Sequence, residues 1–495
     1  MATPPLSSSF LSFFLLIIST LVLILSSSSS NKLGFAFARR EKIESNPLHH
    51  HTHTLQVSSL LPSTTCGPSS KGPKRKSSLK VVHKYGPCSH LHEDKAKTPT
   101  HAEILQHDEA RVKSIHSRLS KMLAGSGGDD LRDVEASADI PAKTGSTIGS
   151  GNYVVTVGLG TPKKDLTLVF DTGSDVTWTQ CEPCTQTCYK QKEPIFNPSA
   201  SNTYTNVTCS SNSCSQLNSA TAPGCSDSTC LYGIQYGDQS FSVGFLAQET
   251  LTLTPTDVFD NFLFGCGENN KGLFAGSAGL LGLARNPLSF VQQSAPKYGH
   301  YFSYCLPSTS SSTGHLTFGK GSDGASNVLN FTPLSKSFSG TSFYGLDITG
   351  ISVAGRRLAI AASVFSTSGS IIDSGTVITR LPPAAYSPLR TAFREAMKEY
   401  PLTDAYEILD TCYDLTSFDD VTFPVISFSF SGGIDVELDE VGVYYAEKIS
   451  QVCLAFAGNS EASDVAIFGN VQQRRLEVVY DLAGGRVGFG PASCT

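Results

Sequence analysis

The sequence is poor in charged residues, tryptophan and methionine. Of its 495 residues, 16% are charged, one is tryptophan and three are methionine. Because an average protein has about 25% charged residues, this composition argues against a coiled coil or a charged solenoid. Glycine, proline and serine are plentiful instead, which predicts many short strands joined by tight turns.

Histidine is nearly absent from most of the chain. Ten of the twelve histidines lie between His49 and His116, so that only His300 and His315 remain beyond them. A Ser–His–Asp hydrolase would have to use one of those two, and neither lies in a recognisable motif. The same scarcity argues against a multi-histidine zinc site. We therefore expect no metal and no other cofactor.

Charge divides the chain into a basic front segment (residues 39–138) and an acidic body (139–495). The net charge is +1 for residues 1–38, +5 for the front segment and −12 for the body. An acidic body is a poor candidate for binding nucleic acid through phosphate neutralisation.

An apolar run at the N-terminus indicates export. Residues 11–25 are apolar apart from Ser and Thr, and a small-residue site follows at 36–38. This pattern predicts a signal peptide over residues 1–38, since the run is short for a membrane span. The sequons at Asn206 and Asn330 are candidate glycosylation sites. We expect the secretory pathway, leading to the extracellular space or to an internal compartment.

The fourteen cysteines indicate an oxidising compartment. Two of them, Cys66 and Cys88, lie in the front segment, and twelve lie in the body. The CxxC at Cys181 and Cys184 has no second CxxC or histidine pair at ligand spacing, so that disulfides are favoured over zinc.

The front segment contains two kinds of sequence. Residues 39–100 are of low complexity and predict a solvated linker; the alternative for their basic run is a nucleic-acid patch. Over 101–122, apolar residues recur at spacings of three and four, which predicts an amphipathic helix before a flexible joint at about 124–150. Such a helix could lie on a membrane, but a propeptide over 39–145, packed on its own enzyme, is the simpler interpretation. The polar face of the helix carries Arg111, Lys113, Arg118 and Lys121.

The body changes to period two from Tyr153 onward, which is typical of strands. A hairpin is expected around a turn at 237–240, and one helix is expected over 384–400, between prolines. The expected strands are 153–157, 167–170, 231–236, 241–246, 348–353, 371–372, 421–430 and 478–480.

Two segments of the body match each other at a separation of 202 residues. Each is a hydrophobic strand that leads to an acidic turn, and the two turns are Asp171-Thr172-Gly173-Ser174 and Asp373-Ser374-Gly375-Thr376. Two carboxylates within hydrogen-bonding distance share one proton and titrate as a pair. The ionised member can act as a general base on water, while the protonated member polarises a carbonyl. The alternative is two unrelated Asx-turns at strand ends.

The residues around each aspartate have a role in this arrangement. Gly173 and Gly375 allow a tight turn that presents backbone N–H groups to the carboxylates. Ser174 and Thr376 can donate hydrogen bonds to the outer carboxylate oxygens. The remaining pair, Thr172 and Ser374, can brace the two loops against each other.

These motifs resemble those of pepsin-type aspartic proteases. Trp178 matches the tryptophan that hydrogen-bonds the flap tyrosine in that family, and Tyr236 matches that tyrosine. Gly237 and Asp238 follow it, on the hairpin that closes over substrate. Within the family, the cysteine-dense insertion and Ser374 look like the atypical plant branch, which includes nepenthesin-like and chloroplast-nucleoid-DNA-binding-protein-like proteases. In a plant, the expected destination of the exported chain is the apoplast or the vacuole, with the plastid as the alternative.

The resemblance implies a mostly β, bilobal pepsin-like acid protease fold with one catalytic Asp loop per lobe. The N-terminal lobe would span 146–340 and include the Cys-rich insertion and the flap, and the C-terminal lobe would span 341–495. The implied disulfides are Cys181–Cys184, Cys188–Cys266, Cys209–Cys230, Cys214–Cys225, Cys305–Cys494 and Cys412–Cys453.

The implied activity is that of a monomeric aspartic endopeptidase that hydrolyses protein or peptide substrates at acid pH. The propeptide would inhibit it until acid releases the helix and self-cleavage occurs around 136–150, leaving an N-terminus just before Tyr153. Alternatives are a catalytically weak relative that acts as a binding protein, and a nucleoid DNA-associated protein. Nucleic acid is not expected to bind the mature form, because the basic run lies in the segment to be removed.

Overall fold

Strands far outnumber helices in the described structure, and most of them are short, as the composition predicts. The computed structural model describes residues 51–69, 77–91, 99–123, 152–217, 221, 223–236, 240–272, 274, 276–320, 329–491 and 494. All of these belong to one unit, His50–Thr495. The predicted signal peptide and the cleavage region at 136–150 lie outside the described residues. No helix in the described part of the chain is both long and apolar enough to cross a membrane.

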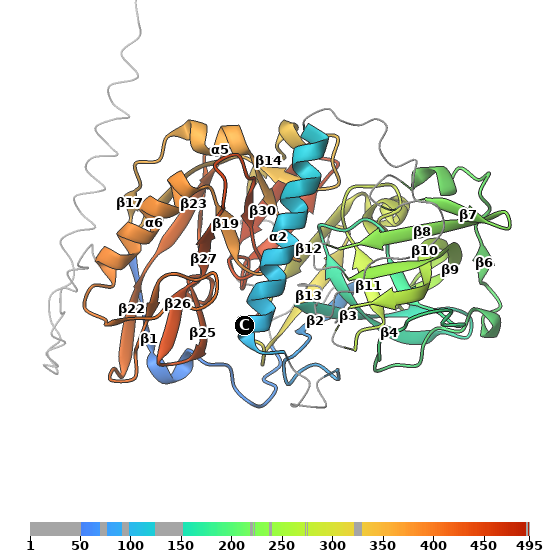
Figure 1. Ribbon diagram of the computed structural model, residues 1–495, viewed down its shortest axis with the longest axis horizontal. Helices are drawn as coiled ribbons and strands as arrows, with labels where there is room; N and C mark the ends of the chain where they lie inside the picture. Colours follow the sequence, from blue (N-terminus) through green and yellow to red (C-terminus); the bar gives the residue numbers. More distant parts are fainter. Residues whose placement is uncertain are drawn as a thin grey trace, which may run out of the picture. The chain divides into compact units, whose positions relative to one another are not determined.

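The largest sheet contains fifteen of the described strands (Figure 1). Its order is β14-β30-β29-β12-β13-β2-β3-β4-β11-β5-β10-β9-β8-β7, and β6 pairs with β9. The strands are β2 (Ser78–His83), β3 (Tyr153–Leu159), β4 (Lys164–Asp171), β5 (Trp178–Gln180), β6 (Thr205–Asn206), β7 (Gly224–Ser226), β8 (Thr229–Gln235), β9 (Phe241–Thr254), β10 (Asp257–Lys271), β11 (Gly279–Gly282), β12 (Tyr301–Cys305), β13 (Thr313–Phe318), β14 (Asn330–Pro333), β29 (Glu477–Asp481) and β30 (Arg486–Gly490).

Smaller sheets form the C-terminal half of the body. Their orders are β15-β18-β28-β19-β27, β17-β16-β23-β24 and β20-β21-β26-β25, and β1 pairs with β22. The strands are β1 (Thr52–Gln56), β15 (Tyr344–Leu346), β16 (Ile348–Val353), β17 (Arg356–Arg357), β18 (Ser370–Ile372), β19 (Thr379–Leu381), β20 (Leu402–Thr403), β21 (Cys412–Tyr413), β22 (Asp420–Pro424), β23 (Ile426–Phe430), β24 (Ile434–Glu437), β25 (Tyr444–Lys448), β26 (Gln451–Leu454), β27 (Phe456–Gly458) and β28 (Ala466–Phe468). The described α-helices are α2 (His101–Leu123), α3 (Phe290–Gln293), α4 (Ala295–Tyr298), α5 (Ala362–Ser368) and α6 (Pro383–Ala396).

The predicted helix over 101–122 is confirmed as α2, and the one over 384–400 is α6. Helix α6 ends earlier than predicted, because Met397 already leaves the helical conformation and a turn follows. The predicted strand over 421–430 is two strands, β22 and β23. Pro424 interrupts the ladder between them, since proline offers no N–H, and the next N–H, of Val425, donates to the carbonyl oxygen of His51.

The prediction of a solvated linker over 39–100 is wrong for much of its described part. Strand β2 lies between β13 and β3 and pairs with both of them. Leu79 and Val81 are buried in the main core, and β1 forms a ladder with β22. Only two apolar residues alternate cleanly with polar ones in β2, so the pattern was too short to distinguish a strand from a linker.

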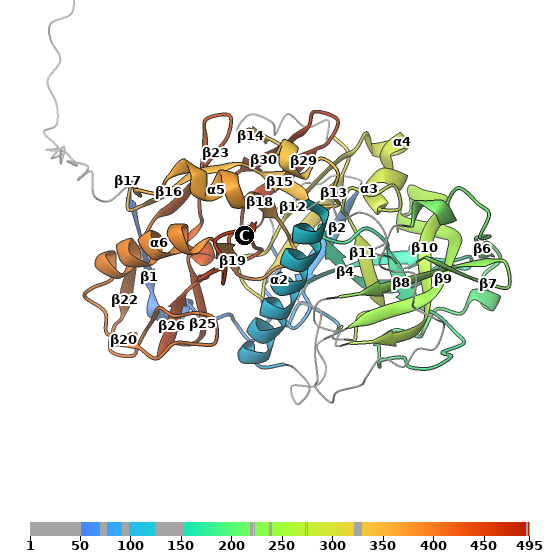
Figure 2. The ribbon, with the colours of Figure 1, turned by 45° about the horizontal axis from the view of Figure 1, so that its top comes forward.

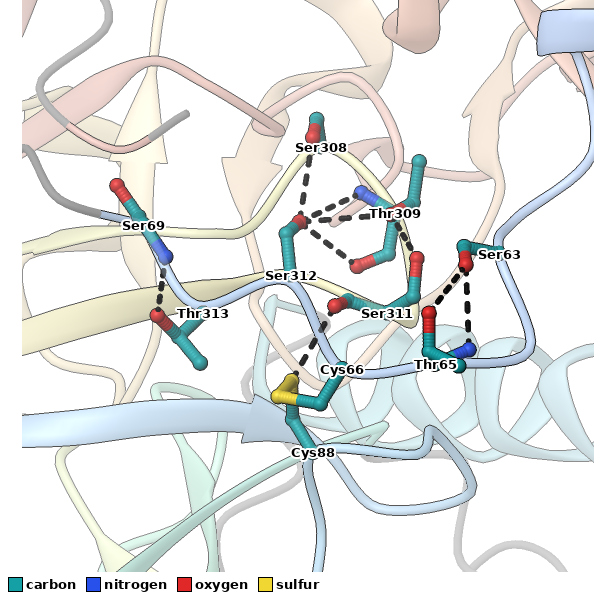
Figure 3. Close-up of a disulfide and its surroundings, with 10 residues drawn as sticks. All are labelled: Ser63, Thr65, Cys66, Ser69, Cys88, Ser308, Thr309, Ser311, Ser312 and Thr313. Carbon is teal, nitrogen blue, oxygen red and sulfur yellow. Dashed lines mark hydrogen bonds between the residues drawn. A yellow bond between two sulfur atoms is a disulfide. The ribbon is translucent and has the colours of Figure 1, made fainter.

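A disulfide closes a loop within this part of the front segment, which also contacts the body (Figure 3). Cys66 bonds to Cys88, and the Cys88 sulfur lies 3.2 Å from the Ser311 carbonyl oxygen. The backbone N–H of Ser69 donates to Thr313 Oγ1 over 3.0 Å. Both cysteines belong to the front segment, so that no described disulfide joins it covalently to the body.

Candidate active site

Two equivalent strand pairs carry the two aspartates. Asp171 is the last residue of β4, which pairs in parallel with β11, and Asp373 follows β18, which pairs in parallel with β28. The apolar residues that precede each aspartate are buried, so that each strand is fixed in the core up to its acidic turn. The turns themselves are therefore held at the strand ends.

The two turns are joined by reciprocal hydrogen bonds. The backbone N–H of Thr172 donates to Ser374 Oγ over 3.1 Å, and the N–H of Ser374 donates to Thr172 Oγ1 over 2.9 Å. The two hydroxyl oxygens are 3.3 Å apart. This symmetric contact ties the position of one aspartate to that of the other.

Each aspartate accepts the same two hydrogen bonds from its own turn. Ser174 Oγ lies 2.5 Å from Asp171 Oδ2, and Thr376 Oγ1 lies 2.6 Å from Asp373 Oδ2. The N–H groups of the two turn glycines donate to the other oxygens, over 2.9 Å to Asp171 and 3.1 Å to Asp373. Both aspartates are fully buried, so that these donors fix the orientation of each carboxyl group.

The guanidinium of Arg111, on α2, contacts both carboxyl groups. Its Nη2 lies 2.7 Å from Asp171 Oδ1 and 2.9 Å from Asp373 Oδ2, and its Nε lies 3.0 Å from Asp373 Oδ2. Helix α2 lies between the strands that carry Asp171 and those that carry Asp373 (Figure 2). The approach is close: a Cβ at Gly375 would lie 2.2 Å from Nη2, so that only glycine leaves room for the guanidinium.

The two carboxyl groups have divergent pKa values. Burial raises the pKa of Asp373, and the negative charge of Asp171 raises it further. Together these two effects outweigh the opposite effect of the Arg111 charge, so that the pKa of Asp373 is raised. Burial also acts to raise the pKa of Asp171, but the Arg111 charge and the hydrogen bonds from Ser174 and Gly173 outweigh it, so that this pKa is lowered. Such divergence is expected of two carboxyl groups that interact strongly.

Tyr236 and Trp178 are brought together as the resemblance implies. Trp178 Nε1 donates to the Tyr236 hydroxyl oxygen over 2.8 Å, and Trp178 itself is fully buried. The ring of Phe274 contacts both aromatic side chains. Gly237 and Asp238, the other predicted flap residues, lie outside the described residues.

A second polar contact anchors α2 one turn before Arg111. Asp108 is fully buried and accepts hydrogen bonds from the N–H groups of Val377 and Ile378, over 2.5 and 3.1 Å. Its Oδ2 also lies 3.1 Å from Arg380 Nη2. The sequence analysis did not predict three of these site residues, namely Asp108, Arg111 and Arg380. The only signal for Asp108 and Arg111 was that they lie three residues apart on a predicted amphipathic helix.

The structure corrects four of the six implied disulfides. Cys181 bonds to Cys266, and Cys184 bonds to Cys188. Cys181 directly follows β5, which runs parallel to β10, and its backbone N–H donates to the carbonyl oxygen of Gly267, the neighbour of Cys266. The other two corrected pairs are Cys209–Cys225 and Cys214–Cys230. In these two pairs, each cysteine bonds to one of similar burial. Cys214 and Cys230 lie in the core cluster that contains Trp178, whereas Cys209 and Cys225 are more exposed. The pairs Cys305–Cys494 and Cys412–Cys453 are present as implied.

The remaining predicted sites are polar positions at the surface. Asn206, at the end of β6, and Asn330, at the start of β14, are both exposed. In the described part of the chain, no three His, Cys, Asp or Glu side chains gather as metal ligands would.

Two family models match the body. The model described as xylanase inhibitor N-terminal matches residues 153–320, and the one described as xylanase inhibitor C-terminal matches residues 343–491. Together they cover more than half of the chain.

Curated relatives are named as proteases. An Arabidopsis thaliana aspartyl protease family protein is 62% identical over 90% of this chain and 93% of its own length. Aspartyl protease AED1 of the same plant is 57% identical over 90% and 92%, and nepenthesin-2 of Nepenthes gracilis is 36% identical over 81% and 88%. None of these names refers to DNA.

Solved structures share the fold. The chain resembles conglutin gamma, a basic 7S globulin from lupine seeds, with a TM-score of 0.56 and 22% identity over 70% of this chain and 93% of that one. Basic 7S globulin from soybean gives a TM-score of 0.54 at 23% identity, over 70% and 92%.

The family and the general activity follow from these relatives. The disulfides and the relatives of this chain indicate a protein of the secretory pathway. The substrates of the protein are proteins or peptides. The chain belongs to the pepsin-type aspartic proteases of plants, in the nepenthesin-like branch, and is an aspartic-type endopeptidase.

Proposed function

We propose that Asp171 and Asp373 are the catalytic pair of this endopeptidase. The observation that carries the proposal is the near-symmetry of the two turns, with matched hydroxyl and N–H donors on two buried carboxyl groups. Because the pair shares a proton, one member takes a proton from an attacking water while the other donates a proton to the carbonyl oxygen of the scissile peptide.

Both protons move again in the second step. The tetrahedral intermediate loses its amine when the C–N bond breaks, and the amine nitrogen takes up the proton that the water gave. The proton on the former carbonyl oxygen goes back to the pair, which restores its shared state. The Thr172–Ser374 contact keeps the carboxyl groups in register during these transfers, since a change in their separation would weaken both hydrogen bonds.

The test is cleavage of a peptide library at acid pH by the matured protein, with and without pepstatin. Asp171→Asn and Asp373→Asn should each abolish cleavage while circular dichroism and thermal unfolding stay close to wild type. If either variant turns over at the wild-type rate, the pair is not catalytic.

Residues 39–145 act as an intramolecular inhibitor in this proposal. The support is Arg111, whose guanidinium lies between the two carboxyl groups, where the attacking water is needed. A guanidinium fork suits two carboxylates at once, because it presents several N–H donors in one plane. A peptide carbonyl cannot reach the pair until α2 leaves.

Acid pH releases the helix, and partly buried histidines of the front segment provide one driving force. Burial lowers the pKa of His83, where Arg474 and Lys84 add to the effect, so that its docked form is neutral. Burial also lowers the pKa of His101, beside Glu447 and Arg474, and of His116, beside Asp464 and Arg380. Because these values fall below the free value of about 6.5, the docked state is favoured above that pH. It loses stability as the pH falls below it.

The proposal also covers the two lobes, the flap, the compartment and the glycosylation sites. Residues 146–340 and 341–495 are the two lobes, each with one aspartate, and Tyr236 with Trp178 forms the base of the flap that closes over substrate. We place the mature monomer in the apoplast or the vacuole, glycosylated at the exposed Asn206 and Asn330.

A further inference from the structure

Arg380 is a buried cation of the body that pairs with acids of the front segment. Its side chain is 1% exposed, and Nη2 lies 3.1 Å from Asp108 Oδ2 and 3.3 Å from Glu109 Oε2. Nη1 donates to the Ile378 carbonyl oxygen over 2.8 Å, and Nε has no partner among the described residues. Both of its ion pairs in the described part of the chain are therefore with α2.

The site around Arg380 is built for a carboxylate. The N–H of Val377 donates to one oxygen of Asp108, and the N–H of Ile378 and the Arg380 guanidinium contact the other. Neither backbone N–H has another acceptor in the described structure. Three convergent donors, one of them charged, match the two oxygens of a carboxyl group, whereas a side-chain amide offers only one acceptor oxygen.

This carboxylate site lies next to the proposed catalytic pair. Val377 directly follows Thr376, whose hydroxyl donates to Asp373. Asp108 precedes Arg111 by three residues, which is about 4.5 Å along a helix axis. An extended peptide advances about 3.3 Å per residue, so that a substrate residue within about two positions of the scissile bond reaches the site.

We propose that Arg380 and the N–H groups of Val377 and Ile378 bind an acidic side chain of the substrate once α2 has left. The mature enzyme therefore prefers Asp or Glu at one position close to the scissile bond. An unpaired buried guanidinium is unfavourable, and a substrate carboxylate restores the pair that Asp108 makes in the precursor. This inference rests on the proposed function, because it takes the Asp171–Asp373 pair as the point of cleavage.

The experiment uses enzyme that has matured from the full precursor. Pairs of peptides that differ only by Glu or Gln at one of the positions within two residues of the cleaved bond are compared at pH 5, where a free Glu is mostly ionised. At one position we expect kcat/KM to be at least tenfold higher for the Glu peptide. The same ratio for Arg380→Gln should fall to about one, and for Arg390→Gln, which removes an arginine on α6 whose side chain is 35% exposed, it should stay at the wild-type value.

A second measurement needs no variant. A peptide with Lys at that position should be cleaved more slowly than the Gln peptide, because its ammonium is repelled by Arg380 and accepts no hydrogen bond from the three donors. Equal cleavage of the Glu and Gln peptides at every position, a Glu preference that survives Arg380→Gln, or cleavage of the Lys peptide as fast as the Glu peptide would overturn the proposal. Failure of the catalytic pair is seen separately, as undiminished cleavage of the Gln peptide by Asp171→Asn.

Discussion

The contact of Arg111 with both aspartates predicts that one substitution unlocks the precursor. Arg111 donates five hydrogen bonds to the two carboxyl groups, and its side chain is 12% exposed. Breaking a buried ion pair by removing one partner costs about 3–5 kcal/mol. The two carboxyl groups can still share a proton after Arg111→Ala, so neither charge is stranded and the lower end of this range applies.

A loss of about 3 kcal/mol weakens docking of α2 about 100-fold, because each 1.36 kcal/mol is a factor of ten. The uncut Arg111→Ala precursor should therefore hydrolyse a fluorogenic peptide at pH 6 at close to the rate of the matured enzyme, while the wild-type precursor stays nearly silent. Gels run beside the assay confirm that the chain is uncut. Arg111→Lys should lie between the two, since an ammonium cannot bridge both carboxylates as the guanidinium does.

The matched control is Lys113→Ala on the same helix. Lys113 is 70% exposed and pairs only with Glu109 among the described residues, and an exposed pair of this kind contributes little. Its precursor should be as silent as the wild type. If the uncut Arg111→Ala precursor is equally silent while amide exchange shows α2 still in place, the inhibition does not depend on Arg111.

Further predictions concern the pair, the flap, the pH switch and β2. Activity of the mature enzyme should be bell-shaped in pH with an acidic optimum, and Asp373→Asn should abolish it without unfolding the protein. Tyr236→Ala should lose much of kcat/KM at unchanged melting temperature; loss of stability with normal specific activity would instead assign Tyr236 to the core. His101→Phe, which cannot gain a charge, should lower the pH at which the precursor matures. Val81→Asp should reduce expression or melting temperature sharply, because it buries a charge in the core, whereas replacing the exposed Lys80 in the same strand should not.

Repetition made the aspartates predictable from the sequence. Each is preceded by a buried apolar strand and followed by the same hydroxyl and glycine positions, so that the two turns could be aligned without a structure. The disulfides were not predictable in this way. Cys214 and Cys230 differ from Cys209 and Cys225 in burial, and burial in an insertion with few strands leaves no periodic signal.

The role of Arg111 was also beyond the sequence. The sequence pattern assigns four basic residues to the polar face of this helix and does not distinguish Arg111 from the others. What separates Arg111 from Lys113 is its position relative to the two turns, which depends on how the helix crosses the body. The charge division of the chain predicted a basic helix on an acidic surface. At Asp108 the signs are reversed, because an acidic residue of the helix pairs with the buried Arg380 of the body.

These opposed contacts respond to acid in opposite directions. Asp108 loses solvent on docking, and burial raises its pKa despite Arg380 and two N–H donors, so that protonation of Asp108 favours the docked helix at low pH. Arg111 acts in the other sense: a positive charge between two carboxyl groups lowers their combined proton affinity relative to the free pair, so that acid weakens its contact. The histidines also favour release, and they do so first, because they titrate below about 6.5 whereas free Asp titrates near 3.9. Release by acid therefore requires the histidines and the catalytic pair to outweigh Asp108, and Asp108→Asn, which removes that opposing titration, should make maturation depend more steeply on pH below about 5.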